Sequence, residues 1–291
     1  LRNSSAASDV YKRQVVLDAG HGGKDSGNRG NQYYEKHIAL KVTLKIGAIL
    51  KKNSDINIIY TRKSDVFIPL NKRADIANSA KADLFVSIHC DAHTSNAYGA
   101  GTFVLGLHEN DRNFRIAQKE NSVIFLEEDY EKNSDGFDPN NPESVISLVL
   151  MQETYLEQSI QAANTIQQSF VRNLKRKNRT VKQAGFLVLR NTYMPSVLVE
   201  LGFLTNKIEG AYLNSKKGQN EMSEAIAKAI VSYKNLLQSD LQEDVVFEDL
   251  SSNTEKNNFE LEYIFRVQIS ASKTMLEPKS FNFKGLSPIK R

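Results

Sequence analysis

The chain has 291 residues, of which 40% are hydrophobic, and a formal net charge of +4 at pH 7. This length and composition allow one sizeable α/β core with a smaller unit beside it, since domains usually run to about 100–200 residues. The single cysteine, Cys90, excludes an internal disulfide. No apolar stretch approaches the roughly 18 residues of a transmembrane helix. No basic run is interleaved with aromatic residues in the way that is typical of nucleic acid binding.

The first fourteen residues show neither the apolar core of a signal peptide nor the periodicity of a helix or strand. We therefore expect residues 1–14 to be a non-native or disordered segment. The missing export signal says nothing about the compartment in which the protein works.

Short apolar runs alternate with helical patterns along residues 15–237. This alternation predicts an α/β fold with a mostly parallel central sheet and helices on both faces. The expected strands are residues 15–18, 56–61, 84–89, 101–106, 186–190 and 197–201. The expected helices are residues 36–50, with Glu35 at the N-terminal edge, and residues 70–80, 144–175 and 221–237.

Between the fourth strand and the third helix lies an insert at about residues 107–143, which is rich in acidic side chains. Beyond the last helix, residues 238–260 have the polar, weakly periodic composition of a linker. Residues 261–291 contain an alternating strand pattern but are too few for an independent core, so we expect a truncated β-containing C-terminal module.

Two histidines follow strand patterns directly: His21 comes after the first strand and His89 ends the third. In a doubly wound sheet, functional groups collect beyond the carboxyl ends of the strands, so both side chains are placed for a shared site. Catalytic zinc prefers histidine nitrogen and carboxylate oxygen, with three protein ligands and one open position. The pair therefore predicts a site for one zinc ion, with a third ligand to be found.

Spacing alone leaves the third ligand open. The candidates are Glu35, His93, Asp91 and Asp18. Glu35 begins a helix, where a carboxylate is also favourable simply because of the helix dipole.

Glu200 ends a wholly apolar strand pattern. An unpaired buried carboxylate is costly and is usually matched to a metal, a partner or a proton transfer. Glu200 is therefore predicted to act as general base toward a water activated by the metal, and then as general acid to the leaving amine.

Together these motifs resemble the zinc-dependent N-acetylmuramoyl-L-alanine amidases of the type 3 family. The resemblance runs from about residue 15 to 237 and rests on residues 15–23 (VVLDAGHGG), Glu35, residues 60–62 (YTR) with Asp65, residues 70–73 (LNKR) ahead of Ala77 and Asn78, residues 85–92 (FVSIHCDA) and residues 195–206 (PSVLVELGFLTN). It implies that His21, Glu35 and His89 are the zinc ligands and that Glu200 is the catalytic carboxylate. The family's usual Ala-Asn after the second histidine is replaced here by Cys90 and Asp91.

The implied reaction is hydrolysis of the amide between N-acetylmuramic acid and the L-alanine of the stem peptide in peptidoglycan, during cell-wall remodelling or daughter-cell separation. The implied location is the periplasm or cell envelope. Two alternatives are a zinc peptidase that cuts peptidoglycan cross-links and a peptidoglycan-binding scaffold without catalysis. Arg62 and Arg73 are expected to form structural salt bridges, or to hold a carboxylate of the stem peptide.

Some members of this family carry a regulatory segment where the acidic insert lies, with a helix that blocks the site and gives a glutamate to the metal. By this resemblance Glu127 or Glu128 would contact the metal, and a protein activator would relieve the block; an ordinary surface loop is the alternative. The tail at residues 263–273 resembles the opening strand and turn of a SPOR domain, a module that binds peptide-free glycan strands. It would bring the protein to division septa.

Overall fold

The computed structural model describes residues 12–106, 111–127 and 153–251. Six strands form one sheet in the order β4-β1-β5-β8-β6-β7. Their bounds are Ile56–Tyr60 for β4, Arg13–Ala19 for β1, Leu84–Asp91 for β5, Ser196–Phe203 for β8, Ala100–Leu105 for β6 and Asn178–Ala184 for β7. Two short strands, β2 (Arg29–Gly30) and β3 (Tyr33–Tyr34), pair separately.

The sheet is mostly parallel, as the alternating pattern predicts. β1 runs parallel to β4 and β5, and β5 runs parallel to β8. β6 pairs with β8 in the antiparallel sense and with β7 in the parallel sense. The carboxyl ends of β1, β5 and β8 therefore meet at one edge of the sheet.

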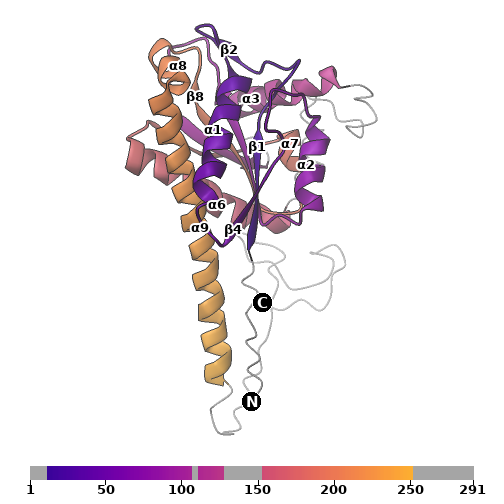
Figure 1. The fold of residues 1–291 in the computed structure, drawn as a ribbon, viewed down its shortest axis with the longest axis vertical. Helices are drawn as coiled ribbons and strands as arrows, with labels where there is room; N and C mark the ends of the chain where they lie inside the picture. The colour runs from indigo at the N-terminus through magenta and orange to yellow at the C-terminus, as the bar shows by residue number, and fades with distance from the viewer. Residues whose placement is uncertain (1–11, 107–110, 128–152, 252–291) are drawn as a thin grey trace, which may run out of the picture. The chain divides into compact units, whose positions relative to one another are not determined.

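Helices cover both faces (Figure 1). One face packs against α1 (Glu35–Leu50), α6 (Glu153–Leu174) and α9 (Lys216–Ser251). The other packs against α2 (Leu70–Ser79), α3 (Asp111–Asn121) and α7 (Leu187–Arg190). The 3-10 helix η1 (Ser122–Leu126) follows α3, and α8 (Lys207–Asn214) follows β8.

Alternation along the strands sets which side chains face which helices. In β5, Val86 and Ile88 belong to the core under α1, whereas Phe85 belongs to the core under α2. Successive side chains of a strand point to opposite faces, so Ser87 and His89 lie on the same face as Phe85. His89 of the candidate site thus points to the face covered by α2, α3 and α7.

The strand predicted at residues 186–190 is wrong, because Leu187–Arg190 forms the short helix α7. A short apolar run does not distinguish a buried strand from a buried helix turn. The strand in this region is instead β7, which lies at the sheet edge and carries polar residues such as Arg179 and Lys182. Polar edge strands lack the apolar pattern on which the prediction depends.

The helix predicted at residues 221–237 is longer, since α9 continues to Ser251 through much of the segment expected to be a linker. Leu241, Gln242 and Glu243 all have high helix propensity, which the weak periodicity of this stretch concealed. α8 was not predicted; Asn206 caps it by accepting hydrogen bonds from the amides of Ile208 and Glu209.

The chain divides into two units, residues 1–242 and 243–291, and the first contains the whole sheet. None of the helices in the described ranges is long and apolar enough to cross a membrane. The expected module at residues 261–291 and most of the segment 1–14 lie outside the described residues.

Phe170 of α6 is fully buried in the core under α1, so truncation would leave a large cavity. We expect Phe170→Ala to lower the free energy of unfolding by about 3–5 kcal/mol. Urea denaturation followed by circular dichroism would measure it. The control is Ile208→Ala, whose side chain is 83% exposed and which should change stability by less than about 0.5 kcal/mol. Equal effects from the two substitutions would contradict this account of the core.

Candidate metal and catalytic site

His21 lies in a tight turn just beyond β1, with its backbone in the left-handed region at φ +59°. The turn passes directly over the ring of His89. A Cβ atom at Gly20 would lie 2.5 Å from Cε1 of His89, so only glycine allows the two imidazole rings to approach. Their ring centroids are 4.8 Å apart.

Glu35 begins α1 and is completely buried. Its Oε2 accepts a hydrogen bond from the amide of Asn28 at 2.7 Å, and its Oε1 accepts one from the amide of Cys90 at 2.8 Å. These two bonds hold the carboxylate between the loop after β1 and the end of β5. Cys90 therefore takes part through its backbone, while its thiol is buried in the core on the other face.

Each histidine has a partner for the ring nitrogen that faces away from Glu35. Nδ1 of His21 lies 2.6 Å from Oδ2 of Asp25. Nε2 of His89 lies 3.1 Å from Oγ of Ser87, whose hydroxyl donates to Asp18 at 2.6 Å. Neutral rings that donate through these outer nitrogens keep a lone pair on Nε2 of His21 and on Nδ1 of His89.

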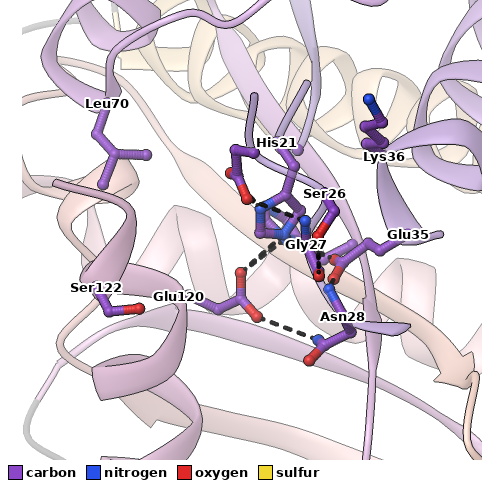
Figure 2. Close-up of polar contacts among 12 residues, drawn as sticks. His21, Ser26, Gly27, Asn28, Glu35, Lys36, Leu70, Glu120 and Ser122 are labelled. Carbon is purple, nitrogen blue, oxygen red and sulfur yellow. Dashed lines mark hydrogen bonds and ion pairs between the residues drawn. The ribbon is translucent and has the colours of Figure 1, made fainter. Parts of the chain in front are cut away.

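The acidic insert contributes a fourth side chain, Glu120 of α3 (Figure 2). Its Oε2 lies 3.1 Å from Nε2 of His21 and 3.1 Å from Nδ1 of His89. Oε1 of Glu35 lies 3.1 Å and 3.0 Å from the same two nitrogens. Asn28 reaches Oε1 of Glu120 at 3.5 Å.

These four side chains fit a metal ion. Their ligand atoms all lie within 4.8 Å of one another, and all four side chains are buried. Nε2 of His21 and Oε2 of Glu120 lie 3.1 Å apart and are buried, yet neither atom makes a hydrogen bond to a described residue. Buried polar atoms usually have a hydrogen-bond partner, so both atoms remain available to bind a metal ion. Tetrahedral zinc with bonds of about 2.0–2.1 Å places neighbouring ligand atoms about 3.3 Å apart. The four nitrogen–oxygen distances between the histidines and the glutamates, 3.0–3.1 Å, are close to this value.

The carboxylates change the protonation of both rings. Burial by itself would lower the pKa of His21, but Glu35 and Glu120 outweigh it and raise that pKa well above its usual value. Burial also acts to lower the pKa of His89, but Glu120 and Glu35 outweigh it and raise that pKa to about 9. Burial acts against ionisation of Glu35, yet the two histidines lower the pKa of that carboxyl well below its usual range.

Glu200 of β8 is paired in register with His89 of β5 and is 3% exposed. Neither carboxylate oxygen has a hydrogen-bond partner among the described residues. Burial, followed by the nearby carboxylates of Asp91, Glu120 and Glu35, raises the pKa of Glu200 well above its usual value. A carboxyl group with a raised pKa binds a proton more readily than an exposed one does, which suits a role in proton transfer.

The structure thus brings His21, Glu35 and His89 together, and it separates them from the other candidate ligands. His93 pairs with Ser95, Asp91 accepts from the amide of Ala92, and Asp18 forms a buried ion pair with Arg73.

The insert reaches the cluster through a residue other than those predicted. Glu127 instead accepts a hydrogen bond from the amide of Leu70, and Glu128 lies outside the described residues. Glu120 lies on the buried face of α3 and can therefore reach the two histidines. Glu127 follows η1, one turn of chain further on, and its side chain contacts the start of α2 instead. Glu120, Asp25 and Asn28 were not predicted from the sequence. For Glu120 the available signal was the amphipathic pattern over residues 111–121.

Known N-acetylmuramoyl-L-alanine amidases are similar to this chain over most of its length. Residues 15–232 match the model of the N-acetylmuramoyl-L-alanine amidase family. The chain is similar to the N-acetylmuramoyl-L-alanine amidase AmiA of Salmonella typhimurium, with 35% identity over 227 residues, 76% of this chain and 76% of that protein. It is 34% identical to AmiA of Escherichia coli over the same shares of both chains.

Two solved structures share the fold. One is the N-acetylmuramoyl-L-alanine amidase from Clostridium difficile 630, with a TM-score of 0.58 and 27% identity over 77% of this chain and 97% of that one. The other is the catalytic domain of CwlV, an N-acetylmuramoyl-L-alanine amidase from Bacillus (Paenibacillus) polymyxa, with a TM-score of 0.56 and 29% identity over 77% and 98% of the two chains.

Because the carboxylates raise the pKa of His21 and of His89, the metal-free rings hold extra protons at pH 7 that a metal must displace. We therefore expect zinc binding to release protons at pH 7. Its apparent affinity should weaken as the pH falls below about 9, the pKa of His89, because protons then compete with the metal for the ring nitrogen. Calorimetric titration in buffers of different ionisation enthalpy would count the protons.

The control is His37→Ala, which removes an exposed imidazole of α1; zinc binding to this variant should release the same number of protons as binding to the wild type. Heats that do not depend on the buffer would contradict the expectation.

Proposed function

Since the chain belongs to the N-acetylmuramoyl-L-alanine amidase family, and is thus a peptidoglycan amidase, we propose that it cleaves its substrate with one zinc ion held by His21, Glu35 and His89. The bond cleaved is the amide between N-acetylmuramic acid and the L-alanine of the stem peptide. The observation that supports the zinc site best is the convergence of four buried side chains, whose ligand atoms all lie within 4.8 Å of one another: His21, Glu35, His89 and Glu120.

When bound, zinc would lower the pKa of a water molecule and polarise the scissile carbonyl. The protein's own residues prepare the site for that chemistry. Asp25 and Ser87 fix the orientation of the two imidazole rings, and two backbone amides fix Glu35. Little reorganisation is then required of the protein during the reaction.

In this proposal Glu200 moves the proton. Its carboxylate would take a proton from the attacking water and pass it to the nitrogen of the leaving L-alanine. Two features support the role: both of its oxygens are free of hydrogen bonds among the described residues, and burial beside other carboxylates raises its pKa well above the usual value, which favours acceptance of a proton.

The acidic insert restrains this activity through Glu120 in the same proposal. A zinc site with four protein ligands is closed, whereas a catalytic one keeps a position open. Glu120 lies where it would fill that position. Its helix is anchored by the next residue: the side chain of Asn121 donates to the carbonyl of Gly185 at 2.7 Å and accepts from the amide of Leu187 at 2.8 Å.

A partner protein that binds the insert and withdraws α3 would act as activator. We place the enzyme in the periplasm or cell envelope, where peptidoglycan is found, with a role in wall remodelling or daughter-cell separation. Residues 261–291 would add a second contact with glycan through the SPOR-like segment; this rests on sequence resemblance, since those residues lie outside the described part of the chain.

Removing the blocking carboxylate should activate the enzyme. A hydrogen bond to a charged group contributes about 1.5–3 kcal/mol, so Glu120→Ala should raise the release of dye from labelled peptidoglycan by roughly tenfold or more. Lys119→Ala, an exposed side chain on the same helix, is the matched control. Activity of Glu120→Ala equal to or below that of the wild type, with zinc content unchanged, would rule out the restraint.

Removing the proposed base should abolish turnover without removing the metal. In the Glu120→Ala background we expect Glu200→Gln to lower kcat by roughly 10²- to 10⁴-fold while zinc content stays the same. Glu157→Gln, an exposed glutamate of α6, is the control. Mass spectrometry of the products would show intact stem peptides and peptide-free glycan, whereas cut stem peptides would indicate the peptidase alternative. Wild-type turnover by Glu200→Gln would overturn the mechanism.

A further inference from the structure

Arg62 is a buried cation whose hydrogen bonds all go to backbone carbonyls. It is 3% exposed. Its Nε donates to Ala19 at 2.9 Å, its Nη1 to Ser64 at 3.0 Å, and its Nη2 to Gly20 at 2.7 Å and to Lys36 at 2.9 Å. It forms no ion pair with any carboxylate of the described residues. A buried charge is normally paired, so a role other than charge neutralisation must account for it.

The acceptors of Arg62 flank two of the proposed zinc ligands. Gly20 directly precedes His21, and Lys36 directly follows Glu35. A single nitrogen, Nη2, bonds to both carbonyls. The guanidinium therefore joins the turn that carries His21 to the first turn of the helix that carries Glu35.

A second guanidinium holds the same turn from another side, in a different way. Arg73 donates to the carbonyl of His21 at 2.9 Å and to Oδ1 of Asp18 at 2.7 Å. The other carboxylate oxygen of Asp18 accepts from Ser87, which in turn contacts His89. Arg73 thus has a carboxylate partner and connects the two histidines, whereas Arg62 alone reaches the segment of Glu35.

We propose that Arg62 is a positioning residue that sets the separation of His21 and Glu35 and thereby the affinity of the site for zinc. This inference rests on the zinc site proposed above. The planar guanidinium fork directs its N–H groups at three different backbone segments, which a flexible aliphatic or ammonium side chain cannot reproduce. Loss of the fork frees the two ligand-bearing segments to separate. A role in folding alone would change stability and leave the zinc affinity of the folded protein unaltered.

The test compares R62M with the wild type and with K63M, which removes the exposed neighbouring cation that lies over the ring of Tyr60. Metal-free protein is titrated with Zn²⁺ in competition with a chromogenic chelator. Changes in residues that orient metal ligands typically weaken binding by about 10- to 100-fold, and we expect a loss of this size for R62M. K63M should bind as the wild type does, and R62K should recover part of the loss, since its ammonium keeps one donor group.

Absorption of the Co²⁺-substituted protein supplies a second readout, because band intensity reports coordination geometry: R62M should differ from the wild type and K63M should not. Wild-type zinc affinity in folded R62M overturns the inference. R62Q takes the place of R62M in the same test if R62M does not fold. Failure of the wild-type protein to bind Zn²⁺ would instead overturn the proposed zinc site, so the two failures are distinct.

Discussion

Two carboxylates, Glu35 and Glu120, converge on one point inside the protein, and the rest of the site depends on this convergence. Buried carboxylates are costly, and two of them side by side remain ionised only when positive charge lies between them. Protons on His21 and His89 can supply that charge, and so can a divalent cation. The same four side chains therefore suit a protonated metal-free form and a metal-bound form with deprotonated rings.

The four donors differ in how firmly the fold holds them. His89 lies in a central strand of the sheet, and His21 and Glu35 come from segments joined by backbone hydrogen bonds and by the Arg62 guanidinium. Glu120 comes from a helix in an insert, which packs on the core through Ala117 and is held by two hydrogen bonds of the Asn121 side chain. Three donors thus come from the core fold and one from the insert, which in the proposed regulation is withdrawn. This asymmetry is what a switchable site requires.

The sequence was most informative where local pattern and chemistry coincide. Strands buried on both faces, such as β5, have continuous apolar runs, so a histidine or glutamate that interrupts such a run is conspicuous; this is how His89 and Glu200 could be found. The polar edge strand β7 has no such run. Glu120 could not be placed from spacing, because its contact with Asn28 joins residues 92 positions apart and depends on how the insert packs. Arg62 was expected to form a salt bridge, and nothing in its sequence context indicated four carbonyl acceptors instead.

The position of Glu120 has a consequence for inhibitor discovery. In the proposed closed state, a metal-chelating compound must displace a carboxylate tethered to the same chain, whose effective concentration is in the millimolar range for a short tether. The compound binds only the molecules that are open, so its apparent affinity falls in proportion as the open fraction becomes smaller. A screen against the resting enzyme would rank compounds by their ability to compete with the protein's own side chain. A screen against a form with α3 withdrawn would rank them by their fit to the site.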